Sequence, residues 1–596
     1  MGTDIRAVVV GLLVIAAILL GLFNSSVLGM YQNRSTSQAG VIHDQGSFGA
    51  PPGGSLKPYL YPAATSPVGG LVLVKEKTDD AFALQIFKGD RSLARLVLYS
   101  NPWELQWNPS GTAVAFFAES INRPGIYELH IWSIASSGAT VAVGPPTRNA
   151  SYGIKWSPDG KYLSYVVRGR NQSNLAILEI RGLGTRVEQV IKDIIPEAGG
   201  AWSPDSKQVA FVAFGSAESN LTLLDLRQHR LRPLTRISTI DAKDLNWSPS
   251  IDTLALALRD DGEERFHLLL VSIRGATKEC REKERDLESP VWLNERGDME
   301  YIVTSDSRES AYRANRCRNP VEIYRPFSGG GRLQNDGYTH KSAIFIAEET
   351  DGPPRLASSM PIRRKHNEQP RTPYQLWLSI NGRKVPAWFW PNVGESSNGR
   401  AIVLVHGGPH LHESGGWDPL KQAFIDQGFT VLAVNYSGSS GYGRRYEEAN
   451  ELDNQAADLI ASIHFLSTSQ RIPPAQITIF AASYGTQIAI LATKLEPSLC
   501  GLLVLNSLTA RGPSGATPSP SPFVGRVIAF QGVRDTLTNP AKAYAFFQKT
   551  FPSATSYWRQ FQDEGHAISR ISSLREEFGT ILCATDLKSC AGLSKR

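Results

Sequence analysis

The stretch Ile477-Thr478-Ile479-Phe480-Ala481-Ala482-Ser483-Tyr484-Gly485-Thr486 decides the fold of the C-terminal half of the chain. Its apolar start is typical of a buried strand in a parallel sheet, and the apolar residues between positions 488 and 495 predict a helix packed against that strand. The small residues Ala481 and Gly485 let strand and helix approach each other closely. The sharp turn between them therefore presents Ser483 as a candidate nucleophile.

Two later segments supply a carboxylate and an imidazole. The apolar run 527–530 leads into a loop that contains Asp535, and the alternating run 557–561 leads into a loop that contains His566. Singly, such an Asp is typical of a turn and such a His of the surface. A serine hydroxyl, however, needs a neutral imidazole to take its proton and a carboxylate to orient that imidazole. Each residue follows its own strand in the order of an α/β-hydrolase, so the pattern predicts a triad of Ser483, Asp535 and His566.

A glycine-rich loop upstream predicts the oxyanion hole. The strand 401–405 runs into His406-Gly407-Gly408-Pro409-His410, where glycines allow backbone amides to point into a cleft. We expect the backbone N–H groups of Gly408 and Tyr484 to hold the oxyanion. His406, His410 and His412 suggest a metal site as the alternative, but no acidic or Cys partner accompanies them at ligand spacing. The sequence therefore predicts neither a metal nor a cofactor.

Four blocks of sequence carry a resemblance to a known family. They are the Ser483 turn, His406-Gly407-Gly408-Pro409, Asn435-Tyr436-Ser437-Gly438-Ser439-Ser440-Gly441-Tyr442-Gly443, and Asp535 with Glu564-Gly565-His566. Because of these four blocks, the stretch from about residue 372 to 591 resembles the catalytic domain of the prolyl oligopeptidase family of serine peptidases, and most closely its acylaminoacyl-peptidase-like branch. The resemblance implies an α/β-hydrolase domain with a doubly wound, mostly parallel sheet. It also makes Tyr436, beside the oxyanion loop, a candidate for substrate contact.

The N-terminal half repeats a tryptophan, a turn and an alternating strand. The tryptophans, 45 to 49 residues apart, are Trp107, Trp156, Trp202, Trp247 and Trp292. This period predicts an all-β propeller of six or seven four-stranded blades over residues 59–366, closed by the first and last strands of the repeat region. The peptidase domain then occupies residues 367–596. The family has the same two-domain plan, in which the propeller restricts the cleft to oligopeptide substrates; no acidic pair of the dipeptidyl-peptidase type is evident for binding a substrate N-terminus.

Three residues depart from the usual pattern of the family. Ala481 and Thr486 replace glycines, and Gln531 stands where a histidine normally precedes Gly532. The connection from 505 to 526 is also short, and its Pro/Ser-rich segment 512–522 cannot hold the helix that walls the specificity pocket in the family. Two alternatives to a peptidase follow: an esterase or acyl hydrolase with the same triad, and a catalytically weak protein that binds ligands with its propeller.

Composition and the N-terminal segment bear on partners and location. With 41% hydrophobic and 20% charged residues over 596 positions, the chain is long enough for two globular domains, and its dispersed net charge of +6 disfavours a nucleic-acid partner. The apolar run from Ala7 to Phe23 predicts a membrane anchor at 1–23, with a cleaved signal peptide as the alternative. Residues 24–58 are predicted to form a flexible tether that leaves the catalytic domains extracytoplasmic.

The chain has five cysteines. The pairs nearest in sequence are Cys280 with Cys317 and Cys583 with Cys590.

Overall fold

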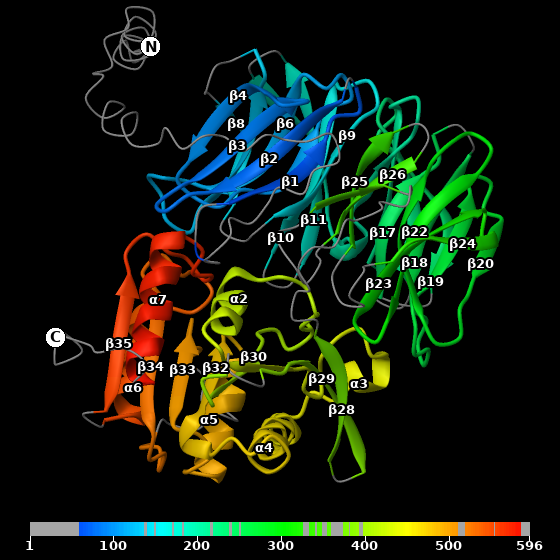
Figure 1. Cartoon of the computed structure of the whole chain (residues 1–596). Helices are drawn as coiled ribbons and strands as arrows, with labels where there is room; N and C mark the ends of the chain where they lie inside the picture. The colour runs from blue at the N-terminus through cyan, green and yellow to red at the C-terminus, as the bar shows by residue number, and fades with distance from the viewer. Residues whose placement is uncertain are drawn as a thin grey trace, which may run out of the picture. The chain divides into compact units, whose positions relative to one another are not determined.

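The computed structural model of the chain contains a series of antiparallel sheets followed by one large mixed sheet (Figure 1). It describes Leu56 and residues 59–585, apart from 69, 136–139, 148–150, 170–171, 182–183, 215–218, 238–240, 250–251, 326–332, 340–341, 348–354, 359–372, 381, 393–396, 511–518 and 553–554. The predicted anchor at 1–23 and nearly all of the predicted tether lie outside these residues. Among the residues that are described, no helix is long and apolar enough to cross a membrane.

The antiparallel part consists of six four-stranded sheets and one three-stranded sheet, each built from consecutive strands. The first three sheets are β1 (Tyr59–Thr65), β2 (Leu71–Lys77), β3 (Phe82–Lys88), β4 (Arg91–Leu98); β5 (Trp103–Trp107), β6 (Ala113–Glu119), β7 (Tyr127–Ser133), β8 (Thr140–Thr147); and β9 (Tyr152–Trp156), β10 (Tyr162–Arg168), β11 (Ser173–Arg181), β12 (Gly184–Ile191). The next three are β13 (Gly200–Trp202), β14 (Gln208–Ala213), β15 (Ser219–Asp225), β16 (Arg230–Ile237); β17 (Ala242–Trp247), β18 (Thr253–Leu258), β19 (His267–Ser272), β20 (Thr277–Cys280); and β21 (Asp286–Trp292), β22 (Asp298–Ser305), β23 (Arg308–Asn315), β24 (Arg318–Tyr324). The seventh is β25 (Leu333–Thr339), β26 (Ser342–Ala347) and β27 (Arg355–Ser358). These sheets are the blades of the predicted propeller, which is therefore confirmed.

The repeated tryptophans close the first strand of each blade from the second to the sixth. Trp107, Trp202, Trp247 and Trp292 are buried, which accounts for the repeat by packing alone. The seventh sheet contacts β1, so the first and last blades are neighbours. Among the described strands, however, none from one end of the repeat pairs with the other end. Closure therefore comes from packing between whole blades. A disulfide between Cys280 and Cys317 links the fifth and sixth blades.

The C-terminal part is an eight-stranded sheet in the order β28-β29-β31-β30-β32-β33-β34-β35. Its strands are β28 (Tyr374–Ile380), β29 (Arg383–Trp390), β30 (Ala401–Val405), β31 (Thr430–Val434), β32 (Ile477–Ala482), β33 (Leu502–Asn506), β34 (Arg526–Gly532) and β35 (Ser556–Phe561). The six strands β30 to β35 run parallel, while β28 and β29 are antiparallel. This is the doubly wound, mostly parallel sheet expected for an α/β-hydrolase.

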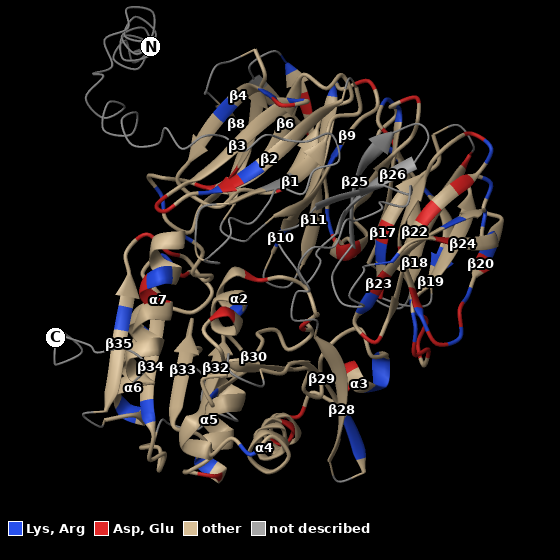
Figure 2. Ribbon diagram, viewed as in Figure 1, with Lys and Arg blue, Asp and Glu red and all other residues tan. Residues whose placement is uncertain are grey.

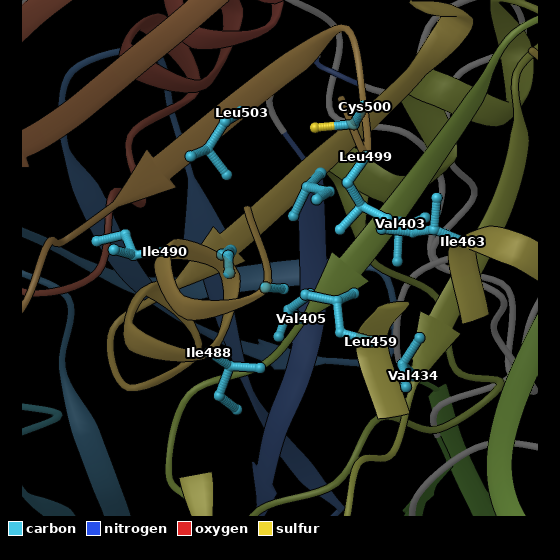
Figure 3. Packing of buried hydrophobic residues seen from close by; sticks show 14 of the residues in the cluster. Val403, Val405, Val434, Leu459, Ile463, Ile488, Ile490, Leu499, Cys500 and Leu503 are labelled. Atoms are coloured by element: carbon cyan, nitrogen blue, oxygen red, sulfur yellow. The ribbon is translucent and has the colours of Figure 1, made fainter. Parts of the chain in front are cut away.

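Helices cover both faces of this sheet. They are α2 (Pro419–Asp426), α4 (Leu452–Thr468), α5 (Gly485–Leu495), α6 (Pro540–Thr550) and α7 (Ile571–Ala584), while the short α3 (Arg444–Glu448) has no buried residue. One apolar cluster joins α4, α5 and α6 to one face, where Val403 and Val405 of β30 meet Ile488 of α5 (Figure 3). A second cluster joins α2 and α7 to the other face. Alternate residues of each strand thus enter opposite cores, as a strand buried on both faces requires.

Two further features bear on the sequence predictions. Leu56, within the predicted tether, is buried in the hydrolase core together with Tyr59, and its carbonyl accepts a hydrogen bond of 2.7 Å from Arg575 of α7. The end of that segment is therefore fixed to the hydrolase part. Lys, Arg, Asp and Glu are interspersed along the blades and helices (Figure 2).

Candidate active site

Ser483 lies on the turn between β32 and α5 with a φ of 49°, in the left-handed region that a non-glycine residue seldom adopts. The turn leaves no room for larger neighbours, because a Cβ on Gly485 would lie 2.5 Å from the carbonyl oxygen of Val405 and 2.6 Å from that of His406. Ala481 is fully buried in the sheet core and is accommodated there. The replacement of the usual glycine at 481 therefore leaves the turn intact.

The structure brings Ser483, His566 and Asp535 together. His566 Nε2 lies 2.9 Å from Ser483 Oγ, and His566 Nδ1 lies 2.9 Å from Asp535 Oδ2. The three residues follow β32, β35 and β34, whose C-terminal ends meet at one edge of the sheet. The Asp535 side chain is fully buried and that of His566 is partly exposed. This arrangement can pass the serine proton to an imidazole that a carboxylate orients.

The carboxylate of Asp535 accepts several hydrogen bonds. Oδ1 accepts from the backbone N–H groups of Leu537 (2.9 Å) and Thr538 (2.8 Å). Oδ2 accepts from His566, from the hydroxyl of Thr538 and, at 2.7 Å, from the amide of Gln531. Burial alone would raise the pKa of Asp535, but the hydrogen bonds from His566 and Thr538 outweigh it and hold the pKa below its ordinary value. Asp535 is therefore ionised at neutral pH.

Thr486 also fits the site in spite of departing from the family pattern. Its hydroxyl donates a hydrogen bond of 2.6 Å to the carbonyl of Ser483, and it accepts one of 3.3 Å from the backbone N–H of Thr509. The side chain is fully buried. Thr486 therefore ties the first turn of α5 to the segment after β33. Of the short connection behind it, residues 511–518 lie outside the described part, and residues 519–525 form neither helix nor strand.

The predicted oxyanion loop lies directly beside Ser483. A Cβ on Gly407 would lie 3.1 Å from the Cβ of Ser483, so a larger residue there would press against Ser483. Gly408 has a φ of 130°, and a Cβ there would lie 2.9 Å from the backbone nitrogen of His410. Tyr484 is the N-cap residue of α5, and its hydroxyl donates to Gln455 Oε1 at 2.9 Å. Glycine at 407 and 408 thus keeps the backbone close to Ser483.

Tyr436 does not lie where a substrate could touch it, which corrects the sequence prediction. The side chain has no exposed surface, and its ring stacks on His406 with centroids 4.3 Å apart. Its hydroxyl donates to the carbonyl oxygens of His406 (2.9 Å) and Gly407 (3.2 Å). Tyr436 therefore supports the oxyanion loop from beneath. The prediction failed because the loop containing 436 folds under the loop it was expected to flank.

His406 is buried in the same place and is neutral around pH 7. Burial lowers its pKa from 6.5 to about 4, although the hydrogen bond to the Gly407 carbonyl raises it. Nδ1 lies 2.7 Å from that carbonyl, which only accepts, so Nδ1 carries the proton. Nε2 lies 2.9 Å from Ser439 Oγ.

The other two histidines of the metal alternative have different neighbours, Ser440 for His412 and Glu447 for His410. Within the described part of the chain, no three His, Cys, Asp or Glu residues are grouped as a metal would require.

The propeller contacts the loops that carry Asp535 and His566. Arg534, next to Asp535, lies over the ring of Tyr99 with its guanidinium carbon 4.5 Å from the centroid, and it donates to the carbonyl of Ser120 at 3.2 Å. Arg570, after His566, lies 4.8 Å from the same centroid and donates to the carbonyls of Tyr99 (2.7 Å) and Asp80 (3.0 Å). Both loops of the triad thus rest on the first two blades.

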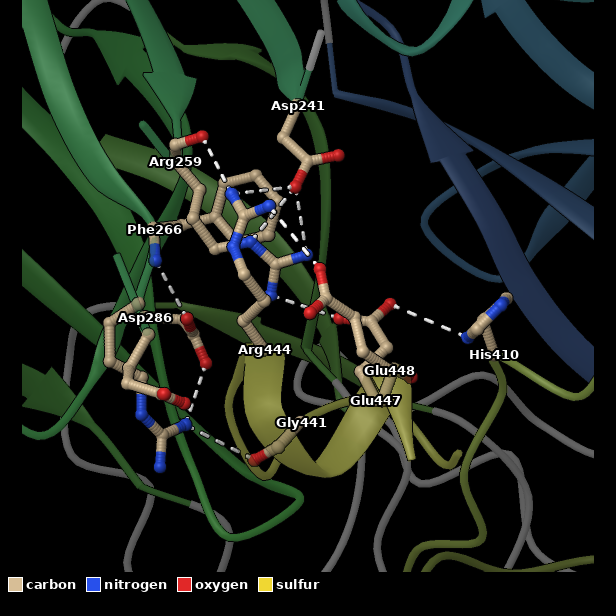
Figure 4. Close-up of polar contacts among 12 residues, drawn as sticks. Asp241, Arg259, Phe266, Asp286, His410, Gly441, Arg444, Glu447 and Glu448 are labelled. Atoms are coloured by element: carbon tan, nitrogen blue, oxygen red, sulfur yellow. Dashed lines mark hydrogen bonds and ion pairs between the residues drawn. The ribbon is translucent and has the colours of Figure 1, made fainter. Parts of the chain in front are cut away.

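A second group of contacts joins the propeller to α3 (Figure 4). Arg444 and Arg259 share the carboxylate of Asp241, at 3.1 and 2.9 Å. Arg259, from the fifth blade, also pairs with Glu447 of α3 at 2.9 Å, and Glu447 lies 4.0 Å from His410 of the oxyanion loop. The side chain of Arg259 is buried, so these pairs are less screened by solvent than surface ion pairs. The oxyanion loop is therefore linked through α3 to the propeller.

Residues of the hydrolase core also contact the backbone of His566. The hydroxyl of Ser507 donates to the carbonyl of His566, and Asn506 donates to Glu577 Oε1 of α7 at 2.6 Å. Burial raises the pKa of Glu577 from 4.5 to about 8, because its carboxyl group is fully enclosed and nearby Glu564 and Asp418 repel its charge. Glu577 is therefore protonated at neutral pH.

The three residues that the sequence singled out, Ser483, Asp535 and His566, lie in contact, but sequence reasoning missed several residues that support them. Thr538, Ser507 and Tyr99 carry no local motif, and their roles depend on contacts between distant segments. Gln531 did give a signal, since it was visible as a departure from the family pattern.

Comparison with known proteins agrees with this architecture. Residues 402–587 match the alpha/beta hydrolase family. The structure of a puromycin-hydrolysing peptidase from Mycobacterium tuberculosis superimposes with a TM-score of 0.68 and 16% identity, over 93% of this chain and 99% of that one. At that identity the likeness concerns the fold, and it covers both the propeller and the hydrolase part.

Two sequence relatives are dipeptidyl peptidases. Dipeptidyl peptidase family member 6 of Caenorhabditis elegans is 23% identical over 235 residues, 32% of this chain and 31% of the relative. Dipeptidyl aminopeptidase BIII of Pseudoxanthomonas mexicana is 26% identical over 160 residues, 25% of this chain and 23% of the relative. The matched stretches thus span less than a third of each relative's length. Together with the structural likeness, they support the resemblance to the prolyl oligopeptidase family.

Proposed function

From the premise that the chain shares the two-part fold of the prolyl oligopeptidase family, we propose that it is a serine peptidase that hydrolyses small oligopeptides. The observation that carries the proposal is the relay from Ser483 Oγ through His566 to Asp535, with both contacts at 2.9 Å. This geometry lies within the reach that general-base activation of a serine needs.

In the acylation step, Ser483 Oγ attacks the carbonyl carbon of the scissile peptide bond while His566 Nε2 takes the hydroxyl proton. Asp535, ionised and hydrogen-bonded to Nδ1, stabilises the imidazolium that forms. The tetrahedral oxyanion is held by the backbone N–H groups of Gly408 and Tyr484. When the intermediate collapses, the C–N bond breaks, His566 gives its proton to the leaving amine, and the acyl group stays on Ser483.

Deacylation repeats these steps with water as the nucleophile. His566 takes a proton from water, the hydroxide adds to the acyl carbon, and the serine leaves with the proton that His566 returns. No residue beyond those of acylation is required, and no metal or cofactor takes part in this scheme.

The propeller limits access in this proposal, so that oligopeptides reach Ser483 and folded proteins do not. The support is that blades contact the loops of Asp535 and His566 on one side and α3 on another. A test compares cleavage of a peptide free in solution with cleavage of the same sequence within a folded protein. Equal rates for the two substrates would contradict the access limit.

A fluorophosphonate probe tests the central proposal, since such probes react only with an activated serine. We expect the purified protein to be labelled and the Ser483→Ala variant not to be. Absence of labelling in the folded wild type would refute the peptidase mechanism and favour the alternative of a binding protein.

A substrate panel separates peptidase from esterase activity. Acyl-aminoacyl, prolyl and aminoacyl chromogenic amides are compared with p-nitrophenyl esters. Amides are the harder substrates, because the leaving amine must be protonated by His566 as the C–N bond breaks. Turnover of at least one class of amide is expected, whereas turnover of esters alone would assign the chain to the acyl hydrolases.

The location that we propose is an oxidising, extracytoplasmic compartment, with attachment to the membrane through the apolar run from Ala7 to Phe23. The Cys280–Cys317 disulfide supports the oxidising environment. Thiol alkylation of the protein taken directly from its native source, with and without reductant, tests this. Full alkylation of Cys280 without reductant would contradict it.

A further inference from the structure

Gln531, the residue before the last of β34, is fully buried four positions ahead of Asp535. Its amide nitrogen lies 2.7 Å from Asp535 Oδ2 and 3.1 Å from Thr538 Oγ1. Reversing the amide would turn its oxygen toward the carboxylate, so the NH2 group must face Asp535. The amide oxygen has no hydrogen-bond partner among the described residues. A buried carbonyl without a partner is unfavourable. The two hydrogen bonds that the NH2 group donates offset this cost.

Thr538 completes a closed set of donors around the carboxylate. Its hydroxyl hydrogen goes to Asp535 Oδ2, so its oxygen is available to accept from Gln531. With the N–H groups of Leu537, Thr538 and His566, Asp535 then receives five hydrogen bonds. A carboxylate offers about four lone-pair positions, so every position is occupied by a donor. No place remains for a proton on Asp535.

We propose that Gln531 is a positioning residue for the triad, whose amide competes with His566 for Asp535 Oδ2 and so sets the basicity of the imidazole. An anion that is stabilised by more donors attracts each donor less strongly. Asp535 therefore stabilises the imidazolium form of His566 less than it would without Gln531. The inference rests on the proposed function, because it concerns the residues of that relay.

The ionisable groups around the relay, other than His566, face away from the Asp535 carboxylate. In the described part of the chain, His566 is the one ionisable side chain in contact with the Asp535 carboxylate. Arg534, on the loop of Asp535, turns to Tyr99 and Glu119. On the loop of His566, Glu564 accepts from the backbone of Ser569 and Arg570. A glutamine does not titrate, so its donor persists at every pH, whereas the histidine usual in the family exchanges protons near neutrality.

Three variants test the proposal. Gln531→Leu removes the donor while keeping the volume similar, and Gln531→His restores a ring N–H. Thr550→Val is the matched control, because Thr550 is fully buried on α6 and its hydroxyl also has no partner among the described residues. The rate constant of fluorophosphonate labelling is measured from pH 5 to 9, alongside the unfolding midpoint.

For Gln531→Leu we expect the acidic limb of the labelling profile to move up by about half a pH unit, because His566 becomes more basic. The labelling rate at the optimum falls about tenfold, since Asp535 loses one of the groups that fix its position. Gln531→His regains most of the rate above neutral pH, and Thr550→Val keeps the wild-type profile. An unmoved acidic limb in a folded Gln531→Leu variant would overturn the proposal, as would equal behaviour of the Leu and His variants.

A second readout needs no activity. The downfield proton resonance of the His566 Nδ1–H group, assigned by its loss in His566→Ala, is followed through a pH titration. The pKa of His566 rises in Gln531→Leu if the proposal holds and stays at the wild-type value if it does not. Because this titration is independent of labelling, a wild type that no probe labels refutes the peptidase proposal while leaving the Gln531 inference open to its own test.

Discussion

The hydroxyl of Tyr99, just after β4 in the propeller, donates a hydrogen bond to the carboxylate of Asp563, three residues before His566. The Tyr99 ring also contacts the guanidinium groups of Arg534 and Arg570, at 4.5 and 4.8 Å from its centroid. One propeller residue therefore contacts the loop that carries Asp535 and the loop that carries His566. Ser483, in contrast, is fixed by the packing of β32 and α5 within the hydrolase core.

Tyr99→Ala is expected to lower the rate of fluorophosphonate labelling about tenfold, because loosened loops misplace His566 relative to Ser483. Tyr99→Phe keeps the ring contacts and loses only the hydroxyl, so its loss is smaller. Tyr544→Phe, on the exposed surface of α6, serves as the control. A folded Tyr99→Ala protein that labels at the wild-type rate would show that the two loops hold their positions without the propeller.

Gly485→Ala is expected to abolish labelling and to destabilise the protein by several kcal/mol, because the new methyl group would lie 2.5 Å from a backbone oxygen that cannot move. Circular dichroism melting and probe labelling measure the two effects. Gly579→Ala on α7 is the matched control, since a Cβ there meets nothing within 4 Å. Alanine stabilises a helix interior by about 1 kcal/mol relative to glycine, so the control should melt higher. Equal melting temperatures for the two variants would contradict the steric argument.

His406 predicts a loss of stability in mild acid. Its pKa is about 4 in the folded protein and 6.5 when exposed, so the unfolded chain binds the proton more tightly. The stabilisation is complete above pH 6.5 and is lost as the pH falls toward 4, by about 3 kcal/mol in all. Urea unfolding of wild type and His406→Gln across this range measures the difference. The variant should show the shallower fall, and parallel curves would contradict the assignment.

Glu577 predicts the opposite slope. Its pKa is about 8 when folded and 4.5 when exposed, so the folded state favours the protonated carboxyl group. Stability from this group is highest below pH 4.5 and falls as the pH rises toward 8, by about 3 kcal/mol at pH 7. Glu577→Gln keeps an acceptor for Asn506 and removes the ionisation. Its stability relative to wild type should therefore grow between pH 4.5 and 8, and a constant difference would refute this.

The strands and the relay residues were predictable because each depends on local sequence. Ile477–Ala482 and Arg526–Gly532 are apolar runs followed by loops, and parallel strands bring their C-terminal ends to one edge. The tryptophan period predicted the blades for the same reason. Tyr436 and Tyr99 were beyond such reasoning, since the burial of one and the interdomain contact of the other arise only when separate segments pack. Leu56 was assigned to a tether because nothing in its neighbourhood reveals that α7 accommodates it.

The contact of Leu56 and Tyr59 with the hydrolase core has a consequence for the order of folding. Leu56 precedes the propeller in the chain and Tyr59 begins its first strand, but their partners Arg575 and Trp417 follow the propeller. The apolar cluster that joins α2 and α7 to the sheet therefore cannot be completed until α7 has been synthesised, and Leu56 and Tyr59 lack these partners until then. Contacts so distant along the chain slow folding and leave apolar surface exposed for longer.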